Sequence, residues 1–293
     1  MYRKKKNDSV ALTSRPFRWI AAIVIVMGLT WLSACTSNPF GGDEISPVHR
    51  HIQGTAYLNQ ASYHQGIYVW LEGLNVSTRT DTEGRFSLTL PAKPSTEFSG
   101  VFNLYFYTAN YFLDSADVIV RDSEFVYDLG DVNKEGKLGL PKTLRRFLEI
   151  RTKVTPDSIP VDYADLIRVD VTLRATIDSC TVIIPYSLGG SLGAVLVKNT
   201  ASDEIHTFQY AYMVETRETL LVGKIPRTIS MTFSPSYKPL RPGTHDVIPY
   251  LFVRHEPVPH RLIESLGAEV EALGPDYLNM PFWREGGTLH VNK

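Results

Sequence analysis

The feature that most constrains the fold of this chain is a period of two in hydrophobicity, which begins near His49 and continues through most of the sequence. Apolar and polar residues alternate over residues 52–58, 67–71 and 86–90. Successive side chains of a strand point to opposite faces, so this spacing predicts short strands with one buried face. Turn-forming residues separate these segments: Gly66, Gly73, Asp81, Gly84 and Pro91. Such spacing favours an antiparallel sandwich over alternating strands and helices.

The second half of the chain repeats this pattern. Its expected strands lie at residues 148–154, 166–173, 181–185, 193–198, 206–213, 219–222, 228–233 and 247–253. Their regular spacing predicts a second, immunoglobulin-like sandwich. The fold class is therefore all-β, with two tandem antiparallel β-sandwiches over residues 48–140 and 141–293. Cys180 has no partner cysteine nearby and is expected to pack as a small hydrophobic side chain.

Near the C-terminus the period becomes that of a helix. Leu262, Leu266, Val270 and Leu273 fall at i, i+4, i+8 and i+11, which predicts a short amphipathic helix that ends at Gly274-Pro275. We expect this helix to dock on its own sandwich rather than on a partner protein. An aromatic segment follows it and is expected to cover a sheet edge: Tyr277, Met280, Phe282 and Trp283.

The first 34 residues have the organisation of a signal peptide. A basic start precedes an uncharged apolar run from Trp19 to Trp31. As a helix, this run of about 13 residues would span roughly 20 Å, short of the ~30 Å hydrocarbon core of a bilayer. We therefore predict a cleaved signal peptide at residues 1–34 rather than a permanent membrane anchor.

Leu32, Ser33, Ala34 and Cys35 close that run and resemble the lipobox of bacterial lipoproteins. The resemblance implies that Cys35 becomes the acylated first residue of the mature protein, anchored in the membrane through its acyl chains. Thr36 follows where the enterobacterial inner-membrane signal has Asp, which favours the outer membrane of the cell envelope. Residues 35–47 are expected to form a flexible tether.

Residues 49–130 carry a second resemblance. Gly54, the segment 66–73 and the segment Thr78 to Leu88 resemble the carboxypeptidase regulatory-like domain, which implies a prealbumin-like sandwich. In that family a Thr-Asp-x-x-Gly-x-Phe turn links two strands, and here it reads Thr80 to Phe86. Asn110-Tyr111 stands where the family has Gly-Tyr, and Asn tolerates the left-handed conformation. Such modules serve as accessory domains, so the resemblance bears on fold more than on function.

Charge argues against a nucleic-acid partner. The chain has 30 basic and 31 acidic residues; removing the six basic and one acidic residue of positions 1–34 leaves 24 and 30, a net charge of −6. Binding to phosphates needs clustered Lys and Arg. With Cys35 acylated, Cys180 has no partner for an intramolecular disulfide.

Histidine spacing argues against a metalloenzyme, and we predict no cofactor and no metal site. None of the eight histidines is followed at the third position by Glu, the zinc-binding pair of metallocarboxypeptidases. His255-Glu256 and His260 have the wrong spacing for a zinc helix, and the intervening prolines forbid that helix. His49 and His51 could face one side of a strand as metal ligands, although solvated histidines are our preferred interpretation.

Gly189 to Gly193 match the Gly-x-Ser-x-Gly pattern of serine hydrolases, with Ser191 as the nucleophile. That function needs a strand before the serine and a helix after it. The residues that follow are typical of a strand, so we prefer a glycine-rich loop and no enzymatic activity.

Asp131, Asn133, Glu135 and Gly136 resemble the first half of a calcium loop, as in one dockerin repeat. Calcium loops need a carboxylate at position 12, where this chain has Lys142. We therefore predict an interdomain turn at this loop.

Four aromatic residues could form a ligand surface. Tyr105 and Tyr107 share one face of a predicted strand, and Tyr68 and Trp70 could join them from another. Exposed rings of this kind can stack on sugars, whereas contact with the neighbouring domain would bury them. We favour the domain contact. The leading hypothesis is a non-catalytic envelope scaffold or protein-interaction module, followed by a glycan- or peptide-binding surface lipoprotein, with a serine hydrolase as a remote alternative.

Overall fold

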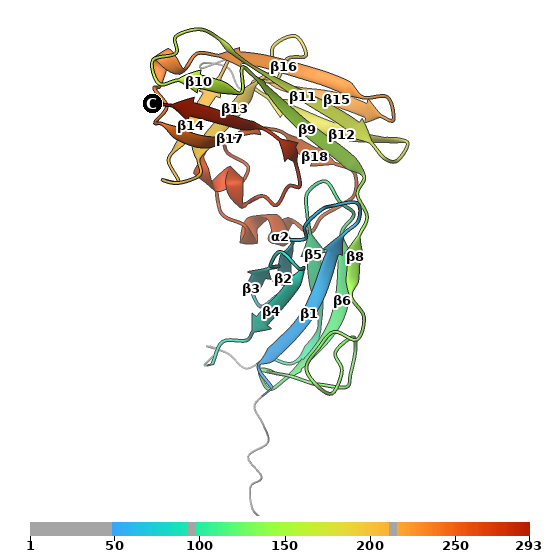
Figure 1. The fold of residues 1–293 in the computed structure, drawn as a ribbon. Coiled ribbons are helices and arrows are strands. Elements are labelled where there is room, and N and C mark those ends of the chain that lie inside the picture. The colour runs from blue at the N-terminus through green and yellow to red at the C-terminus, as the bar shows by residue number, and fades with distance from the viewer. Residues whose placement is uncertain (1–48, 93–97, 211–215) are drawn as a thin grey trace, which may run out of the picture. The chain divides into compact units, whose positions relative to one another are not determined.

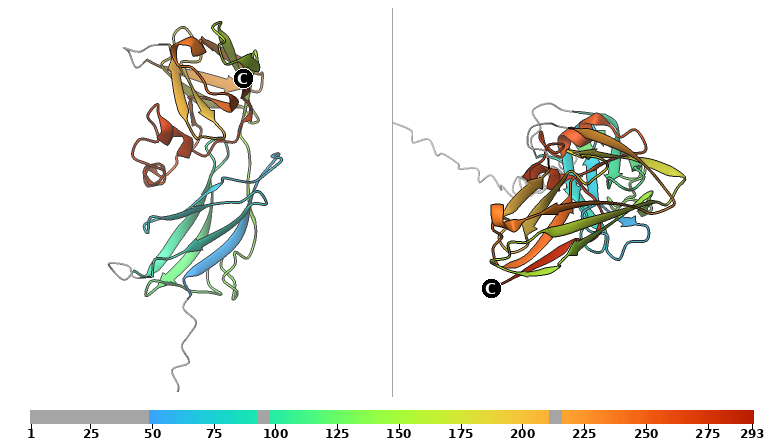
Figure 2. Two further views of the ribbon diagram at one scale, coloured as in Figure 1. Left: turned by 60° about the vertical axis from the view of Figure 1, so that its left-hand side comes forward. Right: turned by 90° about the horizontal axis from the view of Figure 1, so that it is seen from above.

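The alternating segments form strands close to their predicted positions, and the fold is all-β (Figures 1 and 2). The computed structural model describes residues 49–92, 98–210 and 216–293. Within these residues two sets of packed sheets enclose separate apolar cores, one for each half of the chain. The predicted pair of β-sandwiches is therefore confirmed. No helix in the described ranges is both long enough and apolar enough to cross a membrane.

Two sheets form the first sandwich. One contains β4 (Arg85–Thr89), β1 (His51–Leu58) and β8 (Lys142–Leu144), and the other contains β3 (Val76–Arg79), β2 (Tyr68–Leu71), β5 (Gly100–Tyr107), β6 (Asp114–Arg121) and β7 (Glu124–Phe125). β1 is antiparallel to β4 and parallel to β8. The apolar members of the alternating segments fill the space between the sheets, as the period of two requires.

The turn between β3 and β4 has the geometry that its sequence predicts. Asp81 Oδ1 accepts hydrogen bonds from the backbone N–H groups of Glu83 and Arg85, at 3.1 and 2.8 Å. Gly84 adopts φ +81°, and an added Cβ there would lie 2.3 Å from the carbonyl oxygen of Ala56. Phe86 is buried in the core just beyond the turn. Glycine is therefore needed at position 84 for both conformation and space.

Three sheets form the second sandwich. The first sheet contains, in order, β16 (Arg227–Phe233), β11 (Ile167–Ala175), β9 (Leu148–Thr155) and β19 (Glu285–Gly286). The second contains β15 (Arg217–Gly223), β12 (Ser179–Pro185) and β18 (Phe252–Arg254). The third contains β10 (Ser158–Pro160), β20 (Thr288–Asn292), β17 (Gly243–Pro249), β13 (Ala194–Asn199) and β14 (Ile205–Gln209). The strand predicted at 247–253 is divided, since β17 and β18 belong to different sheets. β20 was not predicted, and it pairs with β10 and β17.

Side chains cap the backbone at two terminal strands of these sheets. β14 is the last strand of its sheet, and Lys238 Nζ donates to the Thr207 carbonyl oxygen at 2.7 Å. β16 is the last strand of another sheet, and the Thr232 N–H donates to the Tyr210 hydroxyl at 2.7 Å. These contacts occupy backbone groups that an edge strand would otherwise offer to another chain.

The change from one core to the other falls between Leu144 and Phe147. This is a few residues later than the predicted boundary at 140, because β8 pairs with β1 and adds Leu144 to the first core. Trp283, from the C-terminal segment, also packs in the first core. The chain therefore passes from the first core to the second after Leu144 and returns to the first core at Trp283.

The predicted C-terminal helix is shorter than its apolar stripe. α2 spans only His260–Ser265, and a second helical turn, of the 3₁₀ type, spans Pro275–Asn279; a 3₁₀ turn also occurs at Pro235–Tyr237. Gly267, at φ +144°, follows α2 in a conformation that does not continue a helix. Leu262, Leu266 and Val270 of the stripe are nevertheless buried, and Leu273 is partly buried. The stripe therefore predicted burial correctly, but it predicted a helix that is too long.

Candidate functional site at the junction of the two sandwiches

The four aromatic residues of the proposed ligand surface do lie together, but most of the surface is covered. Tyr68 lies opposite Tyr107, and Trp70 opposite Tyr105, in the pairing of β2 with β5. Tyr68, Trp70 and Tyr107 are only 5, 2 and 6% exposed. Tyr105 is partly exposed and stacks on Trp70 at a ring distance of 5.9 Å. The alternative of an exposed aromatic platform is therefore wrong for three of the four rings.

The C-terminal segment covers these rings. Leu262 and Leu266 of α2, with Val270 and Met280, pack in one apolar cluster with Tyr68, Trp70 and Tyr107. The Tyr68 hydroxyl lies 3.0 Å from Ser265 Oγ, and the Tyr107 hydroxyl donates to Met280 Sδ at 3.6 Å. α2 therefore docks on the first sandwich, beside β2 in Figure 1, and not on its own sandwich as predicted.

The aromatic segment after α2 was expected to cover a sheet edge, but its side chains are buried more deeply than that. Tyr277 is fully buried, Met280 packs on the aromatic rings of the first sandwich, and Trp283 enters the first core. The Tyr277 hydroxyl donates to the Leu251 carbonyl at 2.8 Å and accepts from the Leu251 N–H at 3.2 Å. This segment therefore builds the junction.

Asn110 links the halves by side-chain hydrogen bonds. It is fully buried, and its Nδ2 donates to the carbonyl oxygens of Leu148 and Trp283, each at 2.9 Å. Its Oδ1 accepts from the Trp283 N–H at 3.1 Å. The left-handed backbone considered for Asn110 is not adopted. An amide side chain is used here where glycine could make none of these bonds.

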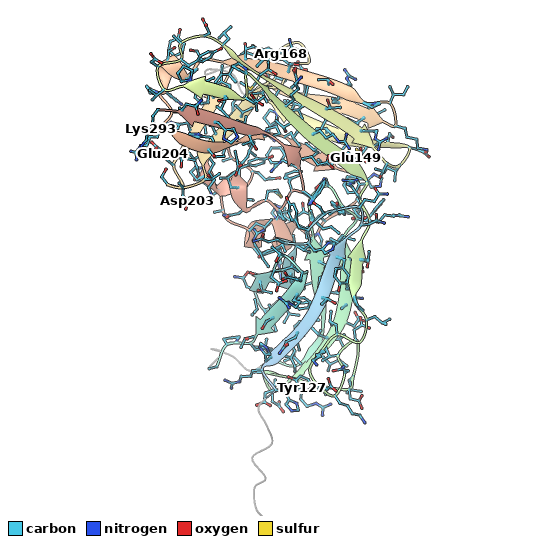
Figure 3. The ribbon with its side chains drawn as sticks, in the orientation of Figure 1. Tyr127, Glu149, Arg168, Asp203, Glu204 and Lys293 are labelled. Carbon is cyan, nitrogen blue, oxygen red and sulfur yellow. The ribbon has the colours of Figure 1, made fainter. Side chains whose placement is uncertain are left out.

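An ion cluster lies beside this amide. Arg146 Nη2 donates to Glu149 Oε1 and to Gln60 Oε1 of the first sandwich, each at 3.2 Å. Arg174 makes two hydrogen bonds of 2.8 Å to the Glu149 carboxylate, which is labelled in Figure 3. These bonds from Arg174, followed by the charge of Arg146, hold the pKa of Glu149 below its ordinary value of 4.5 despite its burial.

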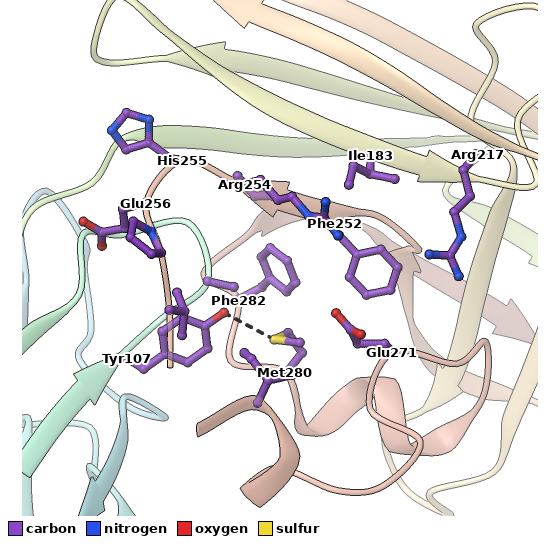
Figure 4. Close-up of a pocket in the computed structure, with 15 residues that line it drawn as sticks. Tyr107, Ile183, Arg217, Phe252, Arg254, His255, Glu256, Glu271, Met280 and Phe282 are labelled. Atoms are coloured by element: carbon purple, nitrogen blue, oxygen red, sulfur yellow. Dashed lines mark hydrogen bonds between the residues drawn. The ribbon is translucent and has the colours of Figure 1, made fainter. Parts of the chain in front are cut away.

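A cavity of about 460 Å³ opens at the junction (Figure 4). Phe252, Phe282 and Met280 supply apolar surface, whereas Arg217 and Glu271 bring charge to it. Other polar residues at its rim are Arg254, His255 and Glu256. This volume and this mixture of apolar walls with a few polar groups are typical of small-ligand sites.

The histidines near this cavity are not arranged for zinc. The His255 ring lies 5.1 Å from that of Phe112 and 4.9 Å from that of Phe147. His260 pairs instead with Glu264, at 3.2 Å. Residues 255–259 are not helical, as the prolines predicted. In the part of the chain that the structure describes, no group of three or more His, Cys, Asp and Glu side chains is placed to hold a metal ion.

At the start of the first sandwich, His49 stacks on Tyr127 with ring centroids 4.1 Å apart. His51 shares hydrogen bonds with Thr89 and Ser87 instead of facing a second ligand.

Ser191 lies in a loop between two strands, as we preferred from its sequence. Its Oγ donates to the Leu188 carbonyl oxygen at 2.7 Å and accepts from the Leu188 N–H at 3.3 Å. β13 begins at Ala194, so the strand–serine–helix geometry of a hydrolase elbow is not formed.

The calcium-like loop is closed by its own chain. Lys142 Nζ lies 3.6 Å from Asp131 Oδ2, so the Lys142 ammonium group pairs with a carboxylate that a calcium ion would need as a ligand. Asn133 Oδ1 accepts from the backbone N–H groups of Glu135 and Lys137, both at 2.9 Å. The loop packs on β1 through the bond from the Leu138 N–H to the Gln53 carbonyl. It therefore belongs to the first sandwich and is not the predicted interdomain turn.

The two cysteines have different positions. Cys35 lies outside the described residues, as do the predicted signal peptide and tether. Cys180 is 3% exposed in the second core, and burial raises the pKa of its thiol to about 11. Its predicted role as a small buried hydrophobic side chain is confirmed.

Comparisons with known proteins do not assign a family. No family model matches this chain. No curated protein matches it. Similar solved structures include a variant of BcpA, the major pilin subunit of Bacillus cereus, at 10% identity over 68% of this chain and 63% of that chain, with a TM-score of 0.24. The TIE protein of Bacillus anthracis is 9% identical over 71% of this chain and 48% of that chain, with a TM-score of 0.22. The major pilin of Streptococcus pyogenes is 8% identical over 69% of this chain and 83% of that chain, with a TM-score of 0.21. The first two matches span 63% and 48% of those chains.

Proposed function

We propose that this chain is a lipid-anchored protein of the cell envelope, held at the outer membrane by acyl chains on Cys35. Its two sandwiches act as a non-catalytic scaffold or protein-interaction module. The lipobox-like quartet that ends at Cys35 supports the anchor, and Thr36 in place of Asp supports the outer membrane. Envelope proteins are the expected partners.

The observation that carries the scaffold role is the covering of the aromatic face. Trp70 is 2% exposed and Tyr107 6%, so these rings join the two sandwiches and are not free to bind sugar. Ser191 Oγ donates to the Leu188 carbonyl oxygen, and the His255 ring packs against the Phe147 ring, so neither side chain is arranged for catalysis. A body joined in this way suits a spacer or docking role at a membrane surface.

Replacing Cys35 tests the anchor. Cys35→Ser should leave residues 1–34 attached and abolish acylation, read by mass spectrometry of the membrane-extracted protein; cell fractionation gives its location. Cys180→Ser is the matched control and should keep the acyl chains and the membrane location. In-cell crosslinking of the wild type, followed by identification of the bound proteins, tests the scaffold role. An unmodified Cys35 would overturn the anchor, and an absence of protein crosslinks would overturn the scaffold.

Ligand binding is the second candidate, and the cavity of about 460 Å³ favours it. A glycan or peptide would place apolar groups on Phe252 and Phe282 and polar groups near Glu271. Titration of the purified full chain with soluble oligosaccharides and short peptides, followed by tryptophan fluorescence, tests this candidate. A saturable signal that Phe252→Ala removes and Phe102→Ala retains would favour ligand binding over a purely structural junction.

A further inference from the structure

A second cavity at the junction, of about 320 Å³, has a cationic lining. The first sandwich contributes Arg79, the second contributes Lys198 and Asp246, and the C-terminal segment contributes Arg284. Asp246 is the one acidic side chain among the described lining residues, against three cations. This cavity is separate from the one in Figure 4, although Met280 and Phe282 line both.

Arg284 is a guanidinium without a counterion. Its Nη2 donates to the Tyr277 hydroxyl at 3.0 Å, and its Cζ lies 4.3 Å from the centre of the Phe282 ring. Its Nε is buried and has no hydrogen-bond partner. Within the described ranges, no carboxylate lies within ion-pair distance of Arg284. Partial burial of a charge without a counterion is unfavourable, and a bound anion would compensate it.

Arg79 is an exposed side chain that also lines this cavity. Its guanidinium donates to the carbonyl oxygens of Gly66, at 3.2 Å, and Asn279, at 2.5 Å, and lies 5.4 Å from the Tyr68 ring centre. No described carboxylate pairs with it. Burial by neighbouring residues lowers the pKa of both Arg79 and Arg284, although the Arg79 side chain remains exposed at the surface. Carbonyl oxygens accept hydrogen bonds but do not neutralise a charge.

Two further polar groups of the lining residues lack partners. Trp283 Nε1 and Thr108 Oγ1 are buried and make no hydrogen bond. Both residues line the same cavity. Buried polar groups are nearly always satisfied in native proteins, so each unsatisfied group needs an explanation.

We propose that this cavity binds an anionic group, a carboxylate or a phosphate, between Arg79 and Arg284. A planar guanidinium holds either group through paired hydrogen bonds, which explains why the cations are Arg at both positions. Lys198 adds positive charge, although its Nζ also pairs with Asp203 at 2.7 Å. The bound group would contact both sandwiches, so its binding would fix the junction. The proposal does not depend on the lipid anchor.

Calorimetric titration of the purified full chain in non-ionic detergent tests the site. One arm uses inorganic phosphate and the other uses succinate, at constant ionic strength. Saturable binding of either anion is expected: tighter binding of phosphate indicates a phosphoryl group as the ligand, and tighter binding of succinate a carboxylate. Arg284→Gln and Arg79→Gln should each weaken binding about tenfold or more, because each removes a charge-assisted hydrogen bond.

Two further variants keep the test decisive. Asp246→Asn removes the negative charge of the cavity and should tighten binding about threefold, an effect that poor folding cannot imitate. Arg227→Gln, at an exposed position of β16, should leave binding unchanged. Failure of the wild type to bind either anion would overturn the proposal. Equal binding by the wild type, Arg284→Gln and Asp246→Asn would overturn it as well.

Discussion

Asn110 illustrates how much of the junction depends on single polar side chains. One amide makes three hydrogen bonds at a site with no solvent exposure, two of them to the backbone of Trp283. Removal of the amide would leave buried backbone groups without partners, and such groups cost more than the bond itself contributes. The energetic effect of this position should therefore exceed that of an exposed asparagine.

Asn110→Ala should lower the free energy of unfolding by about 3 kcal/mol, since it leaves two carbonyl oxygens and one N–H without their partner. Urea denaturation of the full chain measures this change. Asn292→Ala is the matched control, because Asn292 is exposed and its side chain has one hydrogen bond among the described residues, to Ser158 Oγ; it should cost less than about 0.5 kcal/mol. Equal effects of the two substitutions would contradict the proposed linkage.

Glu149 predicts a pH dependence of stability. Its pKa in the folded protein is below the ordinary 4.5, mainly because Arg174 donates hydrogen bonds to its carboxylate. Its contribution is therefore fully present above about pH 4.5 and is lost as the pH falls through the folded pKa. The stability difference between wild type and Glu149→Gln should be constant near neutral pH and should shrink in acid. Urea midpoints between pH 3 and 7 measure it.

Glu269→Gln, at an exposed carboxylate, serves as the control for this pH series. Its stability should follow that of the wild type at every pH. A difference between wild type and Glu149→Gln that grows in acid would exclude the stabilising role assigned to the ionised Glu149.

At the scale of the element, the turn between β3 and β4 makes a specific demand on position 84. Gly84→Ala combines a positive φ with a methyl group 2.3 Å from the Ala56 carbonyl oxygen. Gly66 has a similar φ of +88°, but no atom lies within 4 Å of an added Cβ. Gly66→Ala should cost about 1 kcal/mol from backbone strain alone, whereas Gly84→Ala should cost at least about 3 kcal/mol. Thermal or urea unfolding distinguishes them.

The docking of α2 is a second element whose role can be tested. Leu262 is fully buried against the aromatic rings of the first sandwich, so Leu262→Asp should detach the segment by placing a charge there. Hydrogen exchange of β2 and of residues 260–280 should increase by orders of magnitude. Ile225→Asp is the control, because Ile225 is 85% exposed. Unchanged exchange in Leu262→Asp would show that the contact does not hold the segment.

The sequence predicted those elements that depend on interactions between residues close together in the chain. The period of two located most strands, and the Asp81 and Gly84 positions predicted a turn whose hydrogen bonds are made within five residues. Contacts between distant segments could not be predicted in this way. The stripe from Leu262 onward indicated burial, but periodicity does not say which surface covers it. Arg79 and Arg284 are brought to one cavity only by the folded junction, and no local pattern relates positions so far apart.

At the scale of the whole molecule, the junction should make the two cores unfold together. α2 packs on the first sandwich, Trp283 enters the first core, and Asn110 bonds to Leu148 at the start of the second. We expect one unfolding transition. Leu144→Ala in the first core and Val182→Ala in the second should shift that transition equally when followed by fluorescence and by circular dichroism. Two separate transitions, each moved by one substitution, would show independent sandwiches.

The capped strands β14 and β16 matter most where molecules are crowded. The proposed anchoring at a membrane would confine copies of this protein to two dimensions, so lateral encounters would be far more frequent than in solution. Open strands under those conditions would invite neighbouring copies to continue one another's sheets. Lys238 on the Thr207 carbonyl and the Tyr210 hydroxyl on the Thr232 N–H occupy backbone groups through which such growth would begin. These two contacts favour separate molecules at high surface density over self-association into sheets.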